Sequence, residues 1–159
     1  MDKSFSRNEE MSRNGHHAVT FDDGSTYTGA WRDGKKHGQG TGTWASGNSY
    51  TGAWRDDKKH GHGTETWADV TSYTGAWCDG KMHGQGTYTW ASGSSYTGAY
   101  CDSNMHGHGT FTWAIGHSYE GAWHKNAMHG QGTFTSGKDI ESHELYLGEC
   151  SFDKSFSRN

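Results

Sequence analysis

The sequence predicts an all-β fold: an elongated, single-layer antiparallel β-meander, a rod of about twelve strands built from repeated β-hairpins. A 23-residue unit recurs in phase, and its first residue is Tyr27, Tyr50, Tyr73, Tyr96 or Tyr119. Each unit contains two short β-forming segments separated by turn residues. No segment shows the apolar period of an amphipathic helix.

The repeats divide the chain into three parts. Five full repeats are expected at 27–49, 50–72, 73–95, 96–118 and 119–141. Half repeats are expected at 18–26 and 146–152, the second after an insertion near Lys138 to Leu145, which gives a repeat domain over 18–152. Polar tails are expected at 1–17 and 153–159, and both contain the heptapeptide DKSFSRN. The duplication leaves open that the chain is one period of a longer tandem array.

Each unit reads as a hairpin. The first strand is YTGAW and the second is GTYTW or a variant, both rich in residues that favour strands. Between them, Asp33-Gly34 and Asp79-Gly80 are strong signals for a two-residue hairpin turn. Segments such as ASGSS lead into the next unit, so consecutive hairpins form a continuous meander.

Side chains alternate across each strand, and this predicts two different faces. Tyr73, Gly75 and Trp77 share one face, and Gly84, Gly86, Tyr88 and Trp90 of the next strand join them. We expect an aromatic face whose rings lie over the glycines of neighbouring strands. Threonine and alanine form the other face, open to water. Regular threonine arrays on flat sheets can bind ice, but this array is interrupted, and sheets twist.

The composition excludes several classes of protein. Only 30% of the residues are apolar, but 8 Trp and 8 Tyr supply large rings that can be buried. The net charge of −4 gives no basic signature for nucleic-acid binding. No apolar run reaches membrane-spanning length, and the first residues lack the apolar core of a secretory signal. We therefore expect a cytoplasmic location, and we expect the 3 Cys to be free thiols.

The motif HGQG could be taken for a nucleotide-binding loop or part of a metal site, but its context favours neither. It lacks the third glycine of a dinucleotide loop and leads into a strand. The repeated histidines are expected about 9 to 10 Å apart, two strands from one another, which is too far to share a zinc ion. The pairs His60/His62 and His106/His108 lack a nearby Cys or carboxylate to complete a site. We expect no catalytic residue, metal or cofactor.

Basic residues gather at adjacent hairpin turns. The strip consists of Arg32, Lys35, Lys36, Arg55, Lys58, Lys59 and Lys81. Anionic lipid headgroups attract such strips, by about 1 kcal/mol per residue near the surface. The alternative is a solvated turn region in which Asp33, Asp56 and Asp57 cancel much of the field.

The pattern Tyr-x-Gly-x-Trp, Asp-Gly-Lys and His-Gly-x-Gly at a 23-residue step resembles the MORN (membrane occupation and recognition nexus) repeat, over Ala18 to about Cys150. The last full unit departs most, because Lys125-Asn126 replaces Asp-Gly and Ser136 replaces the tryptophan. The resemblance implies a curved single-layer sheet. It also implies a scaffold at membranes, in the cytoskeleton or in cilia, as in junctophilins and radial-spoke-head proteins, and phospholipid binding has been proposed for the family.

We therefore expect a non-catalytic scaffold or adaptor that binds cytoskeletal or ciliary proteins. The expected contact surface is the aromatic face, made of Tyr27, Trp31, Tyr50, Trp54, Tyr73, Trp77, Tyr88, Trp90, Tyr96, Tyr100, Phe111, Trp113, Tyr119 and Trp123. The alternative is a peripheral membrane module that binds anionic phospholipids through the basic strip. A more remote alternative is a regulatory fragment of a larger repeat or kinase protein. The end strands near Val19 and Tyr146 offer unpaired backbone groups for a homodimer.

Overall fold

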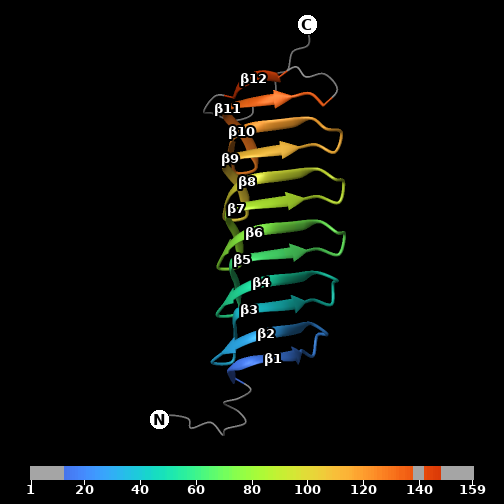
Figure 1. Ribbon diagram of the computed structural model, residues 1–159, viewed down its shortest axis with the longest axis vertical. Coiled ribbons are helices and arrows are strands. Elements are labelled where there is room, and N and C mark those ends of the chain that lie inside the picture. Colours follow the sequence, from blue (N-terminus) through green and yellow to red (C-terminus); the bar gives the residue numbers. More distant parts are fainter. Residues whose placement is uncertain (1–12, 138–141, 148–159) are drawn as a thin grey trace.

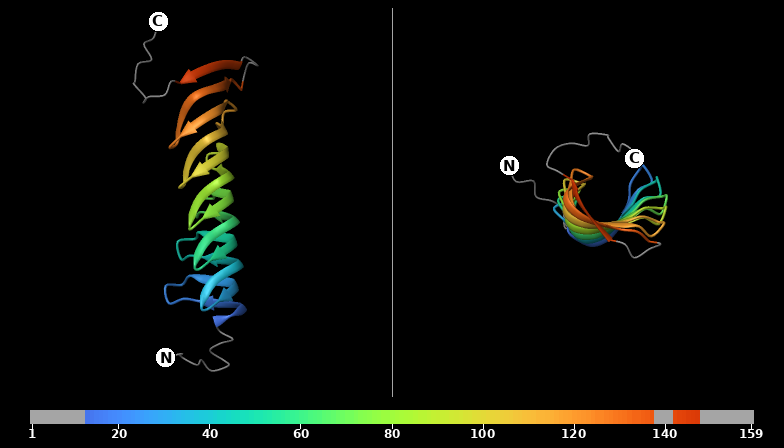
Figure 2. Two further views of the ribbon diagram at one scale, coloured as in Figure 1. Left: turned by 90° about the vertical axis from the view of Figure 1, so that its left-hand side faces the viewer. Right: turned by 90° about the horizontal axis from the view of Figure 1, so that it is seen from above.

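In the computed structural model, residues 13–137 and, by their backbone, 142–147 are described, and they form one open sheet. Its twelve strands are antiparallel and follow one another in sequence order from β1 to β12 (Figure 1). The predicted all-β meander is confirmed. Seen from above, the stacked strands form an open arc, so the sheet is curved rather than flat (Figure 2).

The strands repeat in length as well as in sequence. The first strands of the hairpins are seven residues long: β2 (Thr26–Arg32), β4 (Ser49–Arg55), β6 (Ser72–Cys78), β8 (Ser95–Cys101) and β10 (Ser118–His124). The second strands are nine residues long: β3 (Lys35–Thr43), β5 (Lys58–Thr66), β7 (Lys81–Thr89), β9 (Asn104–Thr112) and β11 (Ala127–Thr135). The end strands are β1 (Gly15–Thr20) and β12 (Ser142–Leu147).

Each hairpin closes with a two-residue turn. Asp33 and Gly34 have φ values of 52° and 76°, the positive values that a type I′ turn requires at both positions. Lys125 and Asn126 adopt 46° and 69°, so the most divergent repeat makes the same turn. Because the turn takes only two residues, the lysines and histidine that follow it belong to the second strand.

The core is a file of tyrosines seated on glycines. Tyr27, Tyr50, Tyr73, Tyr96 and Tyr119 are fully buried. The Tyr73 ring lies over Gly86 of the next strand, where a Cβ would come within 2.3 Å of the tyrosine Oη. The same hydroxyl donates a 2.9 Å hydrogen bond to the carbonyl of Ala76. Burial raises the pKa of Tyr27, Tyr73 and Tyr96 to about 12.

Tryptophans join one repeat to the next. The Trp54 ring meets Tyr50 of its own repeat and Tyr27 of the preceding one edge-on, with centroids 5.0 and 5.3 Å apart. Its Nε1–H donates a 3.0 Å hydrogen bond to the carbonyl of Gly40. Since each ring packs between two repeats, no repeat completes its core alone.

The opposite face is polar, as the alternation predicts. Threonine hydroxyls pair across neighbouring strands at 3.0 Å between Thr41 and Thr51 and at 2.9 Å between Thr64 and Thr74. Such cross-strand pairs support the sheet while leaving this face to water.

The two ends differ from the expected half repeats. β1 begins at Gly15, three residues before Ala18, and the ring of His17 stacks on Trp31 at 5.1 Å. At the other end, the register sets His143 opposite Phe134, the position that Tyr119 takes opposite Phe111 in the last full repeat. The terminal strand therefore falls mostly in the expected insertion, and residues 148–152 of the half repeat lie outside the described residues.

One repeat carries a substitution that leaves a polar atom without a partner. Tyr100 replaces the tryptophan of the other full repeats and is 5% exposed, yet its hydroxyl has no hydrogen-bond partner among the described residues. In three of the other repeats the indole at this place donates to a glycine carbonyl. A buried donor without an acceptor reduces stability.

The close contact between tyrosine and glycine makes a first prediction. Gly86→Ala should reduce the free energy of unfolding by about 3 kcal/mol, the upper end of what overpacking usually costs. The reason is that the buried Tyr73 ring has no room to move away from the new methyl group. Chemical denaturation measures the effect, with the exposed neighbour Gln85→Ala as the control. If the two variants were equally stable, the close contact between Tyr73 and Gly86 would not be what stabilises the core.

The unsatisfied hydroxyl makes a second prediction. Tyr100→Trp should raise the free energy of unfolding by about 1 kcal/mol, since the indole N–H can donate to the Gly86 carbonyl as its equivalents do. Tyr100→Phe, which only removes the hydroxyl, should give a smaller gain. Thermal unfolding of the three proteins side by side tests the ranking, and a loss of stability in both variants would contradict it.

Candidate interaction surfaces

The two long edges of the sheet are built differently. The left-hand edge in Figure 1 carries the two-residue turns that follow the even-numbered strands, and we call it the turn edge. The right-hand edge carries the longer loops that follow the odd-numbered strands, and we call it the loop edge. Five of these loops lie wholly within the described residues, at 21–25, 44–48, 67–71, 90–94 and 113–117.

Most of the expected aromatic contact surface is core. The buried members, at most 6% exposed, are Tyr27, Tyr50, Trp54, Tyr73, Trp77, Tyr96, Tyr100, Tyr119 and Trp123. Sequence alternation placed them on one face over the glycines, but it could not show that the tyrosines and tryptophans also pack edge-on against one another and so shield each other from solvent. A partner cannot reach these rings without unfolding the sheet. The remaining members are half-buried: Trp31, Tyr88, Trp90, Phe111 and Trp113.

A second file of rings runs along the loop edge and is half-buried. We call it the aromatic row, and it consists of Trp44, Trp67, Tyr88, Trp90, Phe111, Trp113 and Phe134. Ring centroids are 5.4 Å apart between Trp67 and Tyr88, and 5.1 Å apart between Trp90 and Phe111. Three members of the row were not among the expected contact residues, although they occupy the same repeat positions as Trp90 and Phe111: Trp44, Trp67 and Phe134.

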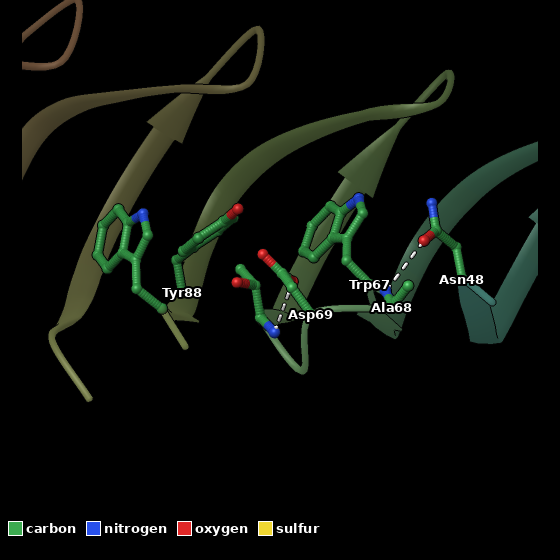
Figure 3. Close-up of a pocket in the computed structure, with 7 residues that line it drawn as sticks. Asn48, Trp67, Ala68, Asp69 and Tyr88 are labelled. Carbon is green, nitrogen blue, oxygen red and sulfur yellow. Dashed lines mark hydrogen bonds between the residues drawn. The ribbon is translucent and has the colours of Figure 1, made fainter. Parts of the chain in front are cut away.

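An open pocket of about 400 Å³ lies within the row, around the 67–71 loop (Figure 3). The Trp67 and Tyr88 rings stand side by side along it (Figure 3). Hydrogen bonds fix its rim, because Asn48 accepts from the N–H of Ala68 at 3.1 Å and Asp69 accepts from the N–H of Thr71 at 3.0 Å. The pocket is therefore a preformed hollow with aromatic walls and one carboxylate at its rim.

Val70 is strained and exposed beside this pocket. Its φ is 64°, a left-handed conformation that β-branched residues rarely adopt, and the equivalent loops have glycine there. The side chain is 73% exposed, and Ile115 of another loop is 72% exposed. Backbone strain of this kind is often found at functional sites.

The charge of the loop edge is one-sided. The five loops that lie wholly within the described residues contain Asp22, Asp23 and Asp69 but no Lys or Arg. All lysines and arginines of the expected basic strip lie at the turn edge or enter the core from it. The two edges thus present different chemistry to a partner.

Two lysines of the basic strip turn inward. Lys59 forms an ion pair with the buried Glu65, and its Nζ lies 4.8 Å from the centre of a Trp77 ring and 5.1 Å from that of Trp44. Lys36 sits in the equivalent place, 5.0 Å from the Trp54 ring. Cation–π contact with the core rings stabilises both ammonium groups, so they are not presented at the surface as the sequence suggested.

The rest of the basic strip is exposed and largely paired. Arg32 lies 3.8 Å from Asp56, Arg55 lies 3.3 Å from Asp79, and Lys81 lies 3.9 Å from Asp102. Lys35 and Lys58 are exposed beside them. The aspartates of the turns therefore offset much of the positive charge at this edge.

Cys78 and Cys101 are free thiols, as expected. His60 has neighbours that the sequence did not reveal. The expectation that the pair His60/His62 lacks a nearby Cys or carboxylate is wrong for His60, because Cys78 and Asp79 of the adjacent strand and turn lie beside it. Pairing between β5 and β6 brings these residues together, and the register of that pairing determines that His60 lies beside Cys78.

Comparison with known families agrees with this architecture. The model of the MORN repeat matches residues 27–49, 50–69, 73–95, 96–118 and 119–138, which together make up most of the chain. No curated protein matches the chain. Among the described residues, no helix is long and apolar enough to cross a membrane.

The strain at Val70 makes a third prediction. Val70→Gly should raise the free energy of unfolding by about 1 kcal/mol, because glycine removes the left-handed penalty of a side chain. Ile115→Gly is the matched control, since it is equally exposed but has no positive φ, and it should not gain stability. Differential scanning calorimetry of both variants makes the comparison, and a destabilised Val70→Gly would contradict it.

Proposed function

The chain belongs to the MORN-repeat family, and we propose that it is a non-catalytic scaffold whose loop edge binds a protein segment with basic and apolar side chains. MORN repeats are generally protein- or membrane-binding modules and are not catalytic. The observation that carries the proposal is the aromatic row, which is half-exposed, continuous over several repeats and next to exposed Val70 and Ile115.

The rings of the aromatic row suit a binding surface because they are held in place. Each packs against the buried core, so little side-chain freedom remains to be lost on binding. Tryptophan and tyrosine are enriched among residues that dominate binding energy. The spacing of about 5 Å between neighbouring rings gives an extended partner segment a series of contacts rather than one.

The charge of the loop edge suggests the chemistry of the partner. A guanidinium or ammonium group stacks favourably on tryptophan and tyrosine faces. Asp69 at the rim of the pocket adds a carboxylate that such a group can pair with. Val70 in the same loop, and Ile115 in a loop two repeats further along the edge, add exposed apolar side chains. We therefore propose a partner segment in which basic and apolar side chains are mixed. Known MORN scaffolds of the cytoskeleton and cilium support a partner from those assemblies.

Binding of anionic membranes at the turn edge is the second candidate. Lys35 and Lys58 are exposed there and favour it. The inward course of Lys36 and Lys59, and the pairing of Arg32 and Arg55 with aspartates, weaken it. Because the two candidates use opposite edges, one pair of variants separates them.

The fourth prediction compares these edges. A synthetic peptide of alternating arginine and leucine should bind the protein, and the variant Asp69→Lys/Ile115→Lys should weaken binding at least about tenfold, as the loss of central contacts usually does. Both changes are at exposed positions, so the fold should persist. Isothermal titration calorimetry measures the affinity, and a peptide with glutamate in place of arginine is the ligand control.

The matched variant Lys35→Glu/Lys58→Glu should leave peptide binding unchanged. It should reduce co-sedimentation with phosphatidylserine vesicles if the turn edge contacts membranes, and that binding should fall with added salt. Peptide affinity that is equal in the wild type and in the loop-edge variant would refute the loop edge as the binding surface.

A further inference from the structure

Three side chains with different ligand atoms converge on the polar face at the turn edge. His60 of β5, Cys78 at the end of β6 and Asp79 in the following turn each place one ligand atom within 4.8 Å of the others. His60 is half-buried, whereas Cys78 and Asp79 are exposed. The group therefore combines an imidazole nitrogen, a sulfur and a carboxylate oxygen at one accessible point of the sheet.

We propose that His60, Cys78 and Asp79 form a zinc-binding site with an open fourth position. Zinc takes histidine, cysteine and carboxylate ligands at about 2.0 to 2.3 Å in tetrahedral geometry, which sets the ligand atoms on the order of 3.5 Å apart. The ligand atoms lie up to 4.8 Å apart, and small rotations of the exposed side chains would shorten these separations to that value. On binding, the thiol loses its proton to solvent and the thiolate coordinates the metal.

The backbone holds the three residues ready for a metal. β5 and β6 pair with Gly61 opposite Trp77, which sets His60 beside Cys78. The turn places an Asp79 oxygen 3.8 Å from His60 Nδ1. The hydrogen bond from the Asp79 N–H to the same nitrogen is long, 3.4 Å, and the ion pair with Arg55 is exposed. Neither is a strong competitor for a metal, since exposed ion pairs contribute little.

The equivalent positions of the other repeats do not offer the same three ligands. The positions equivalent to Cys78 and Asp79 are Arg55 and Asp56 beside His37, and His124 and Lys125 beside His106. In each case a cation stands where a ligand would be needed. Cys101 and Asp102 beside His83 have the right types, but among the described residues only the His60 group brings three such ligand atoms within 4.8 Å of one another. The sequence variation between repeats thus selects one place.

A metal here would tie two repeats together and change the turn edge. It would link β5 of the 50–72 repeat to the turn of the 73–95 repeat, and it would free Arg55 from Asp79. The fourth position faces solvent, so water or a donor atom from a partner can occupy it. The site would make contacts at the turn edge dependent on zinc.

The fifth prediction is that zinc protects Cys78 from alkylation. The full chain is treated with iodoacetamide with and without Zn²⁺, and modification of each cysteine is measured by peptide mass spectrometry. Zinc should slow alkylation of Cys78 about tenfold and that of Cys101 much less. His60→Ala and Asp79→Asn should lower the zinc affinity read from this protection by about 10- to 100-fold. Asparagine retains the positive φ of this turn position, so the hairpin is preserved.

The matched controls are His83→Ala and Asp102→Asn, the same changes one repeat later, and both should leave protection of Cys78 intact. Histidines elsewhere that bind zinc do not affect this readout, since it reports on one thiol. Unprotected Cys78 in the wild type, protection that survives His60→Ala, or equal protection of Cys78 and Cys101 would each overturn the proposed site. Circular dichroism of every variant confirms that the sheet is formed.

Discussion

The seating of a tyrosine ring on glycines of the neighbouring strand is the contact on which this structure depends. A single-layer sheet has no second layer to cover it, so it must bury its apolar surface against its own backbone. Tyr73 does so by lying over Gly86, where the absence of a Cβ makes room, and by donating its hydroxyl to a carbonyl of its own strand. Large rings at a few positions thereby replace the aliphatic core that the composition cannot supply.

This contact also decides where a partner can bind. Rings near the middle of the strands are buried between glycines and tryptophans, whereas rings at the loop edge pack mainly against one another and stay half-exposed. The same periodic sequence thus yields both a core file and an aromatic row. Because the aromatic row packs against the core, a partner that binds there would contact rigid rings. The same side chains would then contribute both to the stability of the sheet and to binding.

Substitutions at equivalent positions give individual repeats different local chemistry while the backbone fold stays the same. Lysine at 36 and 59 and methionine at 82 fill the same place over the core rings, so a charged residue serves as packing where cation–π contact replaces apolar contact. Tyrosine at 100 leaves a hydroxyl unsatisfied. Cysteine at 78, where the preceding repeat has arginine, turns a salt-bridged position into one with metal ligands. A repeat scaffold can therefore acquire local properties without altering its fold.

The sequence by itself determined the meander, the hairpins and the faces of the residues in the YTGAW and GTYTW segments, because the 23-residue period and the two-residue alternation are local and unambiguous. It also pointed to the tyrosine–glycine contact. Only the tertiary structure decided which aromatic residues remain exposed, that Lys36 and Lys59 point inward, and that His60 meets Cys78 and Asp79. Those outcomes depend on the register between strands and on how far each ring shields its neighbours, and neither can be derived from a single strand taken alone.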